Sequence, residues 1–403
     1  MNQPTLSKLV CILFVFCAAT AIASSAQILT TLYRFDDGSD GGIVYAGLVQ
    51  GADGNFYGTT EVGGANGSYG TVFRITSAGT LTTLHSFDGT DGSYPSAAPV
   101  QSSDGNFYGT ADEGGLSGNC TFGCGTVFKI TPSGTLTTLH SFDGADGSGP
   151  GTALVQGSDG NFYGTTYAGG ANDEGTVFKI TPSGTLTTLY SFCTQTNCSD
   201  GVTPGAALVQ AADGNFYGTT VGGGANGNYG TVFKITPGGT LTTLYSFCSQ
   251  NNCSDGYWSY AALVQATDGN LYGTTRAGGH WGVGTIFKIT PQATLTTLHS
   301  FDGADGAYPY AGLVQATDGN FYGTTSSGGV TYNGTVFNIT PHGALTTLHN
   351  FNLTDGANPT DAPVQATDGN FYGTTANGGG WPEAGTVFRL LTVRSCIVCP
   401  SVE

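Results

Sequence analysis

Short runs of alternating apolar and polar residues fill this chain, and glycine-rich turns separate them. The clearest runs are Thr-Val-Phe-Lys-Ile-Thr, as at Thr126–Thr131, and Thr-Leu-Thr-Thr-Leu-His-Ser-Phe, as at Thr135–Phe142. A period of two places alternate side chains on opposite faces, which is typical of β-strands. No stretch of the presumed mature chain has the period of an amphipathic helix. The pattern therefore predicts an all-β protein made of short strands.

One motif, Asp-Gly-Asn-Phe-Tyr-Gly-Thr-Thr, recurs with small changes. Its seven copies are spaced by 50 to 55 residues and lie at 53–60, 104–111, 159–166, 213–220, 268–275, 318–325 and 368–375. Self-similarity with about this period is typical of propellers, solenoids and other repeat arrays. Such an array explains how one domain can be this long.

A single repeat divides into four strands. In the copy that follows Tyr94, we expect strands at Ser96–Ser103, Asn106–Ala111, Thr126–Thr131 and Thr135–Phe142, with tight turns at Asp104-Gly105 and at 132–134. Four short strands describe one blade of a propeller, and seven repeats fit a closed ring. The predicted fold is a seven-bladed β-propeller of four-stranded blades.

Strand order within a blade follows from side-chain size. The run Ala-Gly-Leu-Val-Gln has the smallest residues, so we place it innermost, with the Thr-Leu-Thr-Thr-Leu run outermost. The segment 28–35 resembles an outer strand without a blade before it, whereas the last copy ends at its third strand, 385–391. We therefore expect 28–35 to complete the last blade, which would pair two otherwise open edges.

The repeated DGNFYGTT, GTVFKIT and LTTLHSF segments resemble the GloVer-type tandem repeat of secreted bacterial proteins, over nearly the whole mature chain. That resemblance implies a β-propeller-like array but no defined activity. Members carry varied C-terminal anchors. After Leu391 this chain has neither an apolar segment nor a basic end, which favours release over anchoring. The order of strands also resembles that of NHL-type propellers.

The N-terminus is typical of a secretory signal. Lys8 precedes an apolar run at 9–23 and the small residues 24–26, and the run is shorter than a membrane span. We predict a signal peptide at 1–26, a propeller at 27–391 and a tail at 392–403. The alternatives are cleavage after Ala23 and an uncleaved membrane anchor. The expected location is secreted or extracellular, with the periplasm or the cell surface as alternatives.

Charge limits the partners. The net charge is −17, and charged residues make up only 9% of the chain. An acidic surface repels nucleic acid and anionic lipid. We predict no nucleic-acid partner, no membrane span in the mature chain and a monomer.

Eight cysteines remain after the signal peptide, and they fall in close pairs. In an exported chain this pattern indicates local disulfides; zinc sites and a redox motif at the last pair are the alternatives. The candidate pairs are Cys120/Cys124, Cys193/Cys198, Cys248/Cys253 and Cys396/Cys399.

Length and composition vary mainly in two connections of each repeat, which the predicted topology places on one face of the ring. Loops on a rigid scaffold commonly carry binding groups, and aromatic residues gather in these loops. The candidate ligand-binding residues are Tyr94, Tyr257, Trp258, Tyr260, Arg276, His280, Trp281, Tyr308, Tyr310 and Trp381. They suit an extracellular glycan or protein. The alternative is that these rings pack between blades.

Acidic pairs such as Asp88/Asp91 and Asp143/Asp146 recur in the loops between repeats. They suit side-chain capping of a turn, with calcium binding as the alternative; otherwise we expect no cofactor. The histidines 85, 140, 299 and 349 share one repeat position with tyrosines, so we interpret them as packing groups.

Two functions follow. The first is a non-enzymatic binding propeller. The alternative is an extracellular polysaccharide hydrolase or lyase with its site at the channel mouth, which would need His280 and Arg276 to meet an exceptional glutamate, of which Glu113, Glu174 and Glu383 are the candidates.

Overall fold

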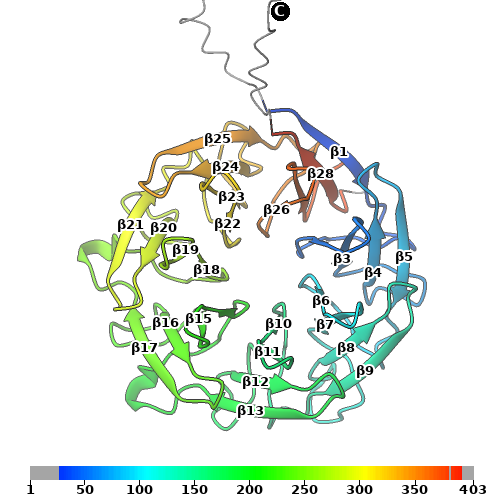
Figure 1. Cartoon of the computed structure of the whole chain (residues 1–403), viewed down its shortest axis with the longest axis horizontal. Helices are drawn as coiled ribbons and strands as arrows, with labels where there is room; N and C mark the ends of the chain where they lie inside the picture. The colour runs from blue at the N-terminus through cyan, green and yellow to red at the C-terminus, as the bar shows by residue number, and fades with distance from the viewer. Residues whose placement is uncertain (1–26, 381–382, 393–403) are drawn as a thin grey trace, which may run out of the picture.

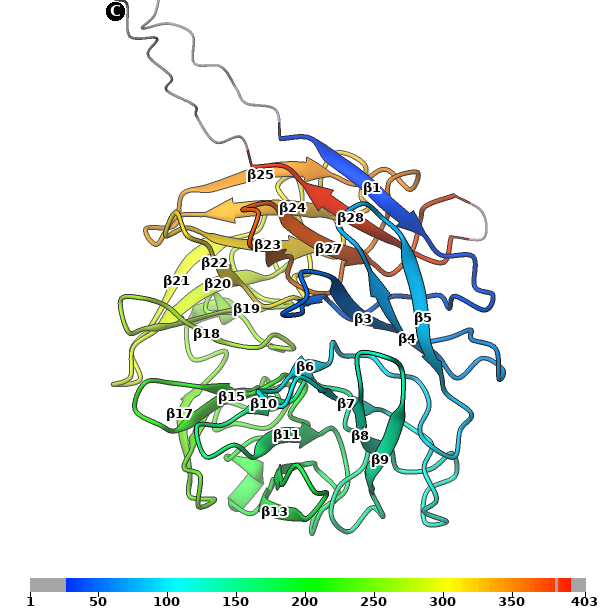
Figure 2. The same ribbon diagram turned by 45° about the vertical axis from the view of Figure 1, so that its right-hand side comes forward.

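The computed structural model describes residues 27–380 and 383–392. Seven four-stranded antiparallel sheets form blades around a central channel (Figure 1), and the view in Figure 2 shows the same ring tilted. The fold is the predicted seven-bladed β-propeller. The only helical elements in the described residues are two short 3-10 turns, η1 (Thr196–Cys198) and η2 (Asn251–Cys253). The predicted signal peptide and tail residues 393–403 lie outside the described residues.

The strand order within each blade is as predicted, from the channel outwards. The inner strands are β2 (Val49–Gln50), β6 (Val100–Gln101), β10 (Val155–Gln156), β14 (Val209–Gln210), β18 (Val264–Gln265), β22 (Val314–Gln315) and β26 (Val364–Gln365). The second strands are β3 (Phe56–Thr60), β7 (Phe107–Ala111), β11 (Phe162–Thr166), β15 (Phe216–Thr220), β19 (Leu271–Thr275), β23 (Phe321–Thr325) and β27 (Phe371–Thr375).

The two outer layers are longer and more regular. The third strands are β4 (Thr71–Ile75), β8 (Thr126–Ile130), β12 (Thr176–Ile180), β16 (Thr231–Ile235), β20 (Thr285–Ile289), β24 (Thr335–Ile339) and β28 (Thr386–Leu390). The outermost strands are β5 (Leu81–Ser86), β9 (Leu136–Ser141), β13 (Leu186–Ser191), β17 (Leu241–Ser246), β21 (Leu295–Ser300), β25 (Leu345–Asn350) and β1 (Leu29–Arg34).

The Asp-Gly-Asn motif forms the turn from the inner to the second strand. Asp53 Oδ1 accepts a hydrogen bond from the Asn55 backbone N–H at 3.1 Å, and the Tyr57 hydroxyl donates to Asp53 Oδ2 at 2.9 Å. Gly54 has a φ of +80°, which a side chain would strain. The prominent motif is thus a structural turn, and the equivalent Asp–Tyr bond recurs in the other blades.

Aromatic stacking joins the blades. Consecutive residues of a strand point to opposite faces, so Phe56 faces the preceding blade and Tyr57 the following one. The ring of Tyr57 stacks on Phe107 with centroids 4.0 Å apart, and six of the seven junctions carry such a Tyr–Phe pair. At the seventh junction Tyr217 meets Leu271 in the same buried cluster.

Polar bonds follow the same route around the channel. The inner-strand glutamine of most blades accepts a hydrogen bond from the backbone of the blade before it, as Gln101 does from Ala52 at 2.8 Å. A threonine of each second strand donates to an inner carbonyl of the next blade, as Thr59 does to Ala97 at 3.1 Å. Neighbouring blades are therefore held by both stacking and hydrogen bonds.

The ring closes at the junction of the last and first blades. Strand β1 pairs antiparallel with β28, so the N-terminal strand completes the last blade as predicted (Figure 1). Gln50 accepts from the Thr367 backbone N–H at 2.9 Å, and the Tyr372 ring stacks on Phe56 at 4.1 Å. The closing junction thus repeats the contacts of the others.

The connections between blades carry a second repeated device. One aspartate of each loop, Asp91 or its equivalent, pairs with a histidine or tyrosine of the preceding outer strand at 2.6 to 3.0 Å. Asp91 also accepts from the Asp88 backbone N–H at 3.0 Å. The predicted turn role is confirmed, and the histidines interpreted as packing groups also hold these carboxylates.

Replacing Leu271 by Phe should complete the belt of stacked Tyr–Phe pairs around the ring by adding the seventh pair. The residue is buried in the register that carries a ring in the six other blades, so a Tyr–Phe pair should raise the free energy of unfolding by about 0.5–1.5 kcal/mol. Denaturant unfolding followed by near-UV circular dichroism measures the change.

The matched control is Phe162→Leu, which removes a ring from a complete junction and should lower stability by a similar or larger amount. Destabilisation by Leu271→Phe would show that this junction has no room for a ring and that the belt is not the common stabilising element.

Candidate functional site

The two ends of the ring differ as the repeat pattern predicts. The short turns, such as 51–55 and 76–80, share one end, and the long connections, such as 61–70 and 87–99, share the other. A cavity of about 870 Å³ opens at the channel mouth on the long-connection end. Ligand pockets are typically about 300–1,000 Å³, so the channel mouth is large enough for a small molecule.

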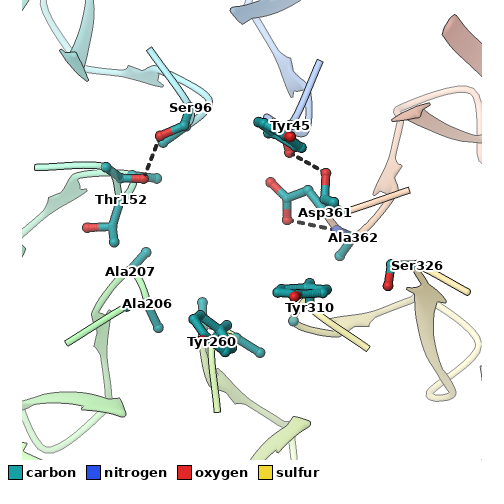
Figure 3. A pocket seen from close by; sticks show the side chains of 18 of the residues that line it. Tyr45, Ser96, Thr152, Ala206, Ala207, Tyr260, Tyr310, Ser326, Asp361 and Ala362 are labelled. Carbon is teal, nitrogen blue, oxygen red and sulfur yellow. Dashed lines mark hydrogen bonds between the residues drawn. The ribbon is translucent and has the colours of Figure 1, made fainter. Parts of the chain in front are cut away.

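One position, four residues before each inner strand, gives the mouth its asymmetry. Blades one, five and six carry tyrosines there: Tyr45, Tyr260 and Tyr310. The other four blades carry Ser96, Gly151, Gly205 and Thr360 at the same register. Figure 3 shows the tyrosines on one side of the cavity and small side chains on the other. One wall is thus aromatic and the opposite wall leaves space.

The tyrosines are arranged for contact from the cavity. The rings of Tyr260 and Tyr310 lie 5.3 Å apart at an interplanar angle of 45°, and both are partly exposed. The ring of Tyr45 is 39% exposed. Burial raises the pKa of Tyr45 and of Tyr260, so their hydroxyl groups stay protonated at neutral pH. Each ring therefore offers an apolar face and a hydrogen-bonding edge.

Asp361 is the only carboxylate among the residues that line this cavity. Its Oδ2 accepts from the Gly47 backbone N–H at 2.8 Å, across the closing junction, and its Oδ1 accepts from the Ala362 N–H at 2.7 Å. Burial raises the pKa of this carboxyl, against the effect of these two bonds. Figure 3 shows its side chain pointing between Tyr45 and Tyr310. Asp361 both bridges two blades and places an acceptor at the mouth.

A second set of positions surrounds the mouth. It consists of the residue that follows each second strand: Glu61, Asp112, Tyr167, Val221, Arg276, Ser326 and Ala376. Gly151 of the cavity wall makes room for one of them, because a β-carbon there would lie 2.9 Å from Asp112 Oδ1. Acidic groups thus stand at blades one and two, and a cation stands across the ring at blade five.

The acidic side is electrostatically strained. Burial and the charge of Glu113 raise the pKa of Asp112 to about 6. Burial and the charges of Asp112 and Glu113 also raise the pKa of Glu61. Ionised carboxylates this close repel one another and lose hydration, which favours their protonated forms. Groups with such shifts are over-represented at functional sites.

Arg276 is held by aromatic rings. Its guanidinium carbon lies 5.0 Å from the Tyr310 ring centroid and 5.6 Å from that of Tyr308, within the range of cation–π attraction. Within the described part of the chain, its buried Nε has no hydrogen-bond partner. The stack fixes the cation beside the aromatic wall.

The backbone beside the inner strands is strained in most blades. Two residues before the tyrosine register, φ is positive in all seven blades, and only Gly149 of these residues is a glycine; the others are Ile43, Tyr94, Thr203, Trp258, Tyr308 and Asn358. Bulky residues rarely adopt this conformation, which costs about 1–3 kcal/mol. Hydrogen bonds to the preceding blade hold it, as from the Tyr308 N–H to the Val283 carbonyl at 2.8 Å.

The predicted site residues divide into groups. Tyr260, Tyr310, Arg276 and Tyr308 come together at the mouth. Tyr257 and Trp258 pack with each other at 4.9 Å and with Tyr229 in a neighbouring loop. His280 and Trp281 are in edge contact at an exposed loop tip, and the Tyr94 N–H donates to the Tyr69 carbonyl. Trp381 lies outside the described residues.

Sequence reasoning missed four residues of this region: Tyr45, Asp361, Glu61 and Asp112. Each could have been found by stacking the seven repeats in register. Tyr45 shares its position with Tyr260 and Tyr310, and Asp361 replaces the alanine or threonine of the other blades. Exceptional residues are easily seen when they are neighbours along the chain, whereas the ring brings together residues about fifty positions apart.

The enzyme alternative requires the side chains of His280 and Arg276 to meet a glutamate. Within residues 27–380 and 383–392, no hydrogen bond or ion pair joins the side chains of His280 or Arg276 to any glutamate. In the same ranges, no group of three His, Cys, Asp or Glu side chains is placed to hold a metal ion.

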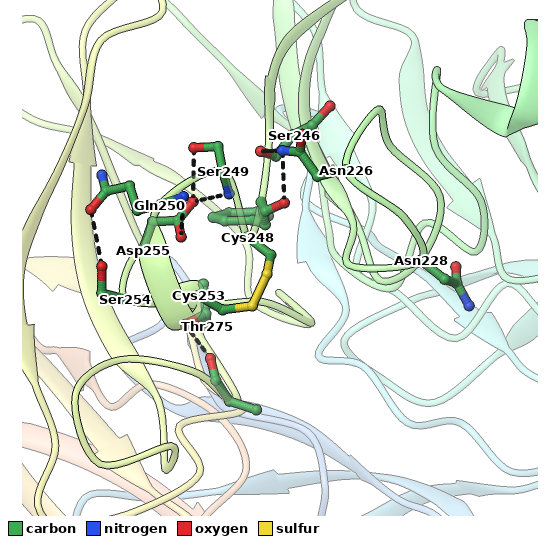
Figure 4. Close-up of a disulfide and its surroundings, with 12 residues drawn as sticks. Asn226, Asn228, Ser246, Cys248, Ser249, Gln250, Cys253, Ser254, Asp255 and Thr275 are labelled. Carbon is green, nitrogen blue, oxygen red and sulfur yellow. Dashed lines mark hydrogen bonds between the residues drawn. A yellow bond between two sulfur atoms is a disulfide. The ribbon is translucent and has the colours of Figure 1, made fainter.

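Three predicted disulfides are confirmed: Cys120–Cys124, Cys193–Cys198 and Cys248–Cys253. Figure 4 shows that the last of these closes the loop that ends in Asp255. This buried carboxylate accepts from the Tyr245 hydroxyl at 2.8 Å and the Ser249 N–H at 2.9 Å. The three disulfides thus constrain long connections at this end of the ring. Cys396 and Cys399 lie outside the described residues.

Comparison with known proteins gives a family and a fold. The sequence matches the family described as the Gloeobacter/Verrucomicrobia repeat over residues 19–210 and 193–388. No curated protein matches the chain. No helix among the described residues is long and apolar enough to cross a membrane.

Two solved structures show similar architecture. One is the extracellular domain of a putative hybrid two-component system from B. thetaiotaomicron, with a TM-score of 0.59 and 12% identity over 90% of this chain and 39% of that chain. The other is a putative 6-phosphogluconolactonase from Bacteroides uniformis, with a TM-score of 0.51 and 19% identity over 76% of this chain and 84% of that chain. The chain spans about two fifths of the first protein. At these identities the likeness concerns the fold alone.

Replacing Asp112 by Asn should stabilise the protein at neutral pH. A folded-state pKa raised to about 6 means that the stability contribution of Asp112 is fully present below pH 4 and is lost as pH rises through 6. The variant should therefore match the parent at pH 4 and exceed it at pH 7.5, by at most about 3 kcal/mol. Thermal melting across this pH range measures the difference.

Asp104 in the same blade is the control, because its pKa is shifted in the opposite direction. Burial alone would raise its pKa, but hydrogen bonds from Asn106, Lys129 and Tyr108 lower it. Asp104→Asn should cost stability at pH 7.5, and this cost should shrink as pH falls through the folded pKa. Equal melting of Asp112→Asn and the parent at pH 7.5 would show that the acidic side carries no strain.

Proposed function

Because the chain belongs to the Gloeobacter/Verrucomicrobia repeat family, whose description implies no chemistry, we propose its function from the geometry of the channel mouth: it is an extracellular binding protein for carbohydrate. The observation that carries the proposal is the aromatic wall. Tyr45, Tyr260 and Tyr310 share one register around a cavity of about 870 Å³, and the opposite wall at that register is serine and glycine.

The chemistry of the wall suits sugar rings. A pyranose ring has an apolar face, which stacks on a tyrosine ring, and hydroxyl groups at its edge, which need hydrogen-bond partners. Asp361 offers an acceptor between two of the tyrosines. Ser326, Asn358 and Asn377 add polar groups to the lining. Apolar and polar contacts are thus available on the same small ligand.

The charge favours neutral glycans. The net charge of −17 and the carboxylates of Glu61, Asp112 and Asp361 oppose an acidic polysaccharide. Arg276 is the only cation at the two repeat positions that surround the mouth, and its guanidinium lies against two tyrosines. We infer that the guanidinium orients these rings and donates hydrogen bonds to ligand hydroxyls. It does not serve to pair with an anionic ligand.

Several features support an extracellular location. Residues 1–26 have the pattern of a signal peptide, and three disulfides suit an oxidising compartment. The similar propeller of known location is an extracellular domain. We propose that the chain is exported and works outside the cytoplasm as a monomer, with the periplasm and the cell surface as narrower possibilities for experiment to separate.

The proposal predicts retention on neutral glycans and its loss with the aromatic wall. Residues 27–403 should bind members of an array of neutral glycans and leave uronate-bearing and sulfated ones unbound. Tyr260→Gly and Tyr310→Ser each introduce a residue that another blade carries at the same register, so the fold should persist. Each should weaken binding by about tenfold or more in calorimetric titration, the equivalent of about 1.4 kcal/mol.

Phe122→Ala is the control, because this aromatic side chain is 73% exposed on the same end and does not line the cavity. If Trp258→Ala and Trp281→Ala abolish retention and the cavity variants do not, the ligand binds to the outer loops. That result would contradict the proposed site in the cavity. Release of soluble sugar from a bound polysaccharide would assign the chain to the hydrolases or lyases.

A further inference from the structure

A shallow groove of about 580 Å³ lies on blade six, between the connection that leads into β22 and the loop between β23 and β24. Its lining includes Asp302, Tyr308, Ser327, Val330 and Tyr332. The side chains of Val330 and Tyr332 are each 80% exposed, and that of Tyr308 is 38% exposed. Exposed apolar side chains that gather along one groove commonly mark binding sites.

The groove is continuous with the aromatic wall of the mouth. Tyr308 lines the groove, and its ring lies 5.6 Å from the Arg276 guanidinium. The same guanidinium lies 5.0 Å from Tyr310, which lines the cavity. An unbroken row of ring and guanidinium faces thus leads from the cavity to the groove.

Tyr308 occupies its place at a conformational cost. Its φ is +53°, where the equivalent residue of blade three is Gly149. Its N–H donates to the Val283 carbonyl at 2.8 Å, and its carbonyl accepts from the Ser326 hydroxyl at 2.8 Å. These bonds fix the backbone that places the ring between mouth and groove. The positive φ recurs at this register in all seven blades, so it is a feature of the scaffold that here positions a tyrosine ring.

We propose that the groove is an extension subsite, and that the ligand is therefore a glycan chain of several sugar rings. This inference rests on the proposed function. One end of the chain sits in the channel mouth, and the chain leaves the ring over Tyr308 towards Val330 and Tyr332. A single sugar would fill the mouth alone and leave the groove empty.

The lining favours a neutral chain with flat ring faces. Asp302 is the only charged residue in the groove lining, and its carboxylate accepts hydrogen bonds from hydroxyl groups but repels anionic sugars. In β-1,4-linked glucose chains the substituents lie at the ring edges, so both faces are free to stack on Tyr308 and Tyr332. Such chains match the row of aromatic faces better than branched or sulfated ones.

A length series tests the extension. The probes are β-1,4-linked glucose oligomers of one to six units and the corresponding N-acetylglucosamine oligomers, titrated calorimetrically into residues 27–403. We expect affinity to rise by at least about tenfold from the single sugar to the longer chains of at least one series. Tyr332→Ala should remove this gain and leave the affinity for the single sugar unchanged, because Tyr332 lines the groove and not the cavity. Tyr308→Gly should also remove the gain with length.

Thr203→Gly is the matched control, since Thr203 holds the register of Tyr308 in blade four with a φ of +57°. It relaxes the same backbone without touching the groove, and the gain with length should survive. Equal affinity for all lengths, or a gain that persists in Tyr308→Gly and Tyr332→Ala, overturns the extension subsite. Neither result contradicts the proposed binding site at the channel mouth. Absence of binding at every length overturns the extension together with the proposed function.

Discussion

Stacking between the second strands of adjacent blades is the interaction on which the rest of the structure depends. Tyr57 on Phe107, and its counterparts at five further junctions, place an aromatic pair in six of the seven interfaces, with ring centroids 4.0 to 4.1 Å apart. A four-stranded sheet cannot bury both faces alone, so the ring is stable only when every neighbour is present. The same strand carries the Asp-Gly-Asn turn at one end and the loops of the candidate site at the other. Its position in each blade therefore fixes both.

This constraint explains why the fold could be predicted in such detail. Each repeat gave the same evidence for strand, turn and order, and the unpaired outer strand at 28–35 could be matched to the incomplete last copy because a ring has no free end. The partnership of the outer-strand histidines with Asp91 and its equivalents was harder to foresee. The two residues lie six positions apart, on a strand and on the turn beyond it, and only the twist of the chain between them brings the imidazole to the carboxylate.

The site was predicted only in part, for a geometric reason. A ring converts distance along the chain into an angle around the axis, so the mouth collects one residue from each blade. Tyr260 and Tyr310 were found because aromatic residues stand out in the variable connections, and Arg276 was found because it departs from the repeat. Tyr45 and Asp361 stand next to the same cavity but belong to the first and last blades, which meet only after closure. The informative comparison runs across repeats at one register, and there a departure from the common residue is visible without any structure.

Such departures also help to distinguish residues that the fold requires from residues that serve a function. At a given register the blades share the same backbone, so the residue that most blades carry shows what folding alone requires. Gly149 shows that the strained position of Tyr308 accepts glycine, and Gly151 and Gly205 show that folding does not need a ring at the register of Tyr260. Closure of the ring therefore does not require an aromatic side chain at either register. The positive φ at the register of Tyr308 recurs in all seven blades, so this backbone conformation belongs to the scaffold, and what distinguishes each blade there is the side chain that it carries.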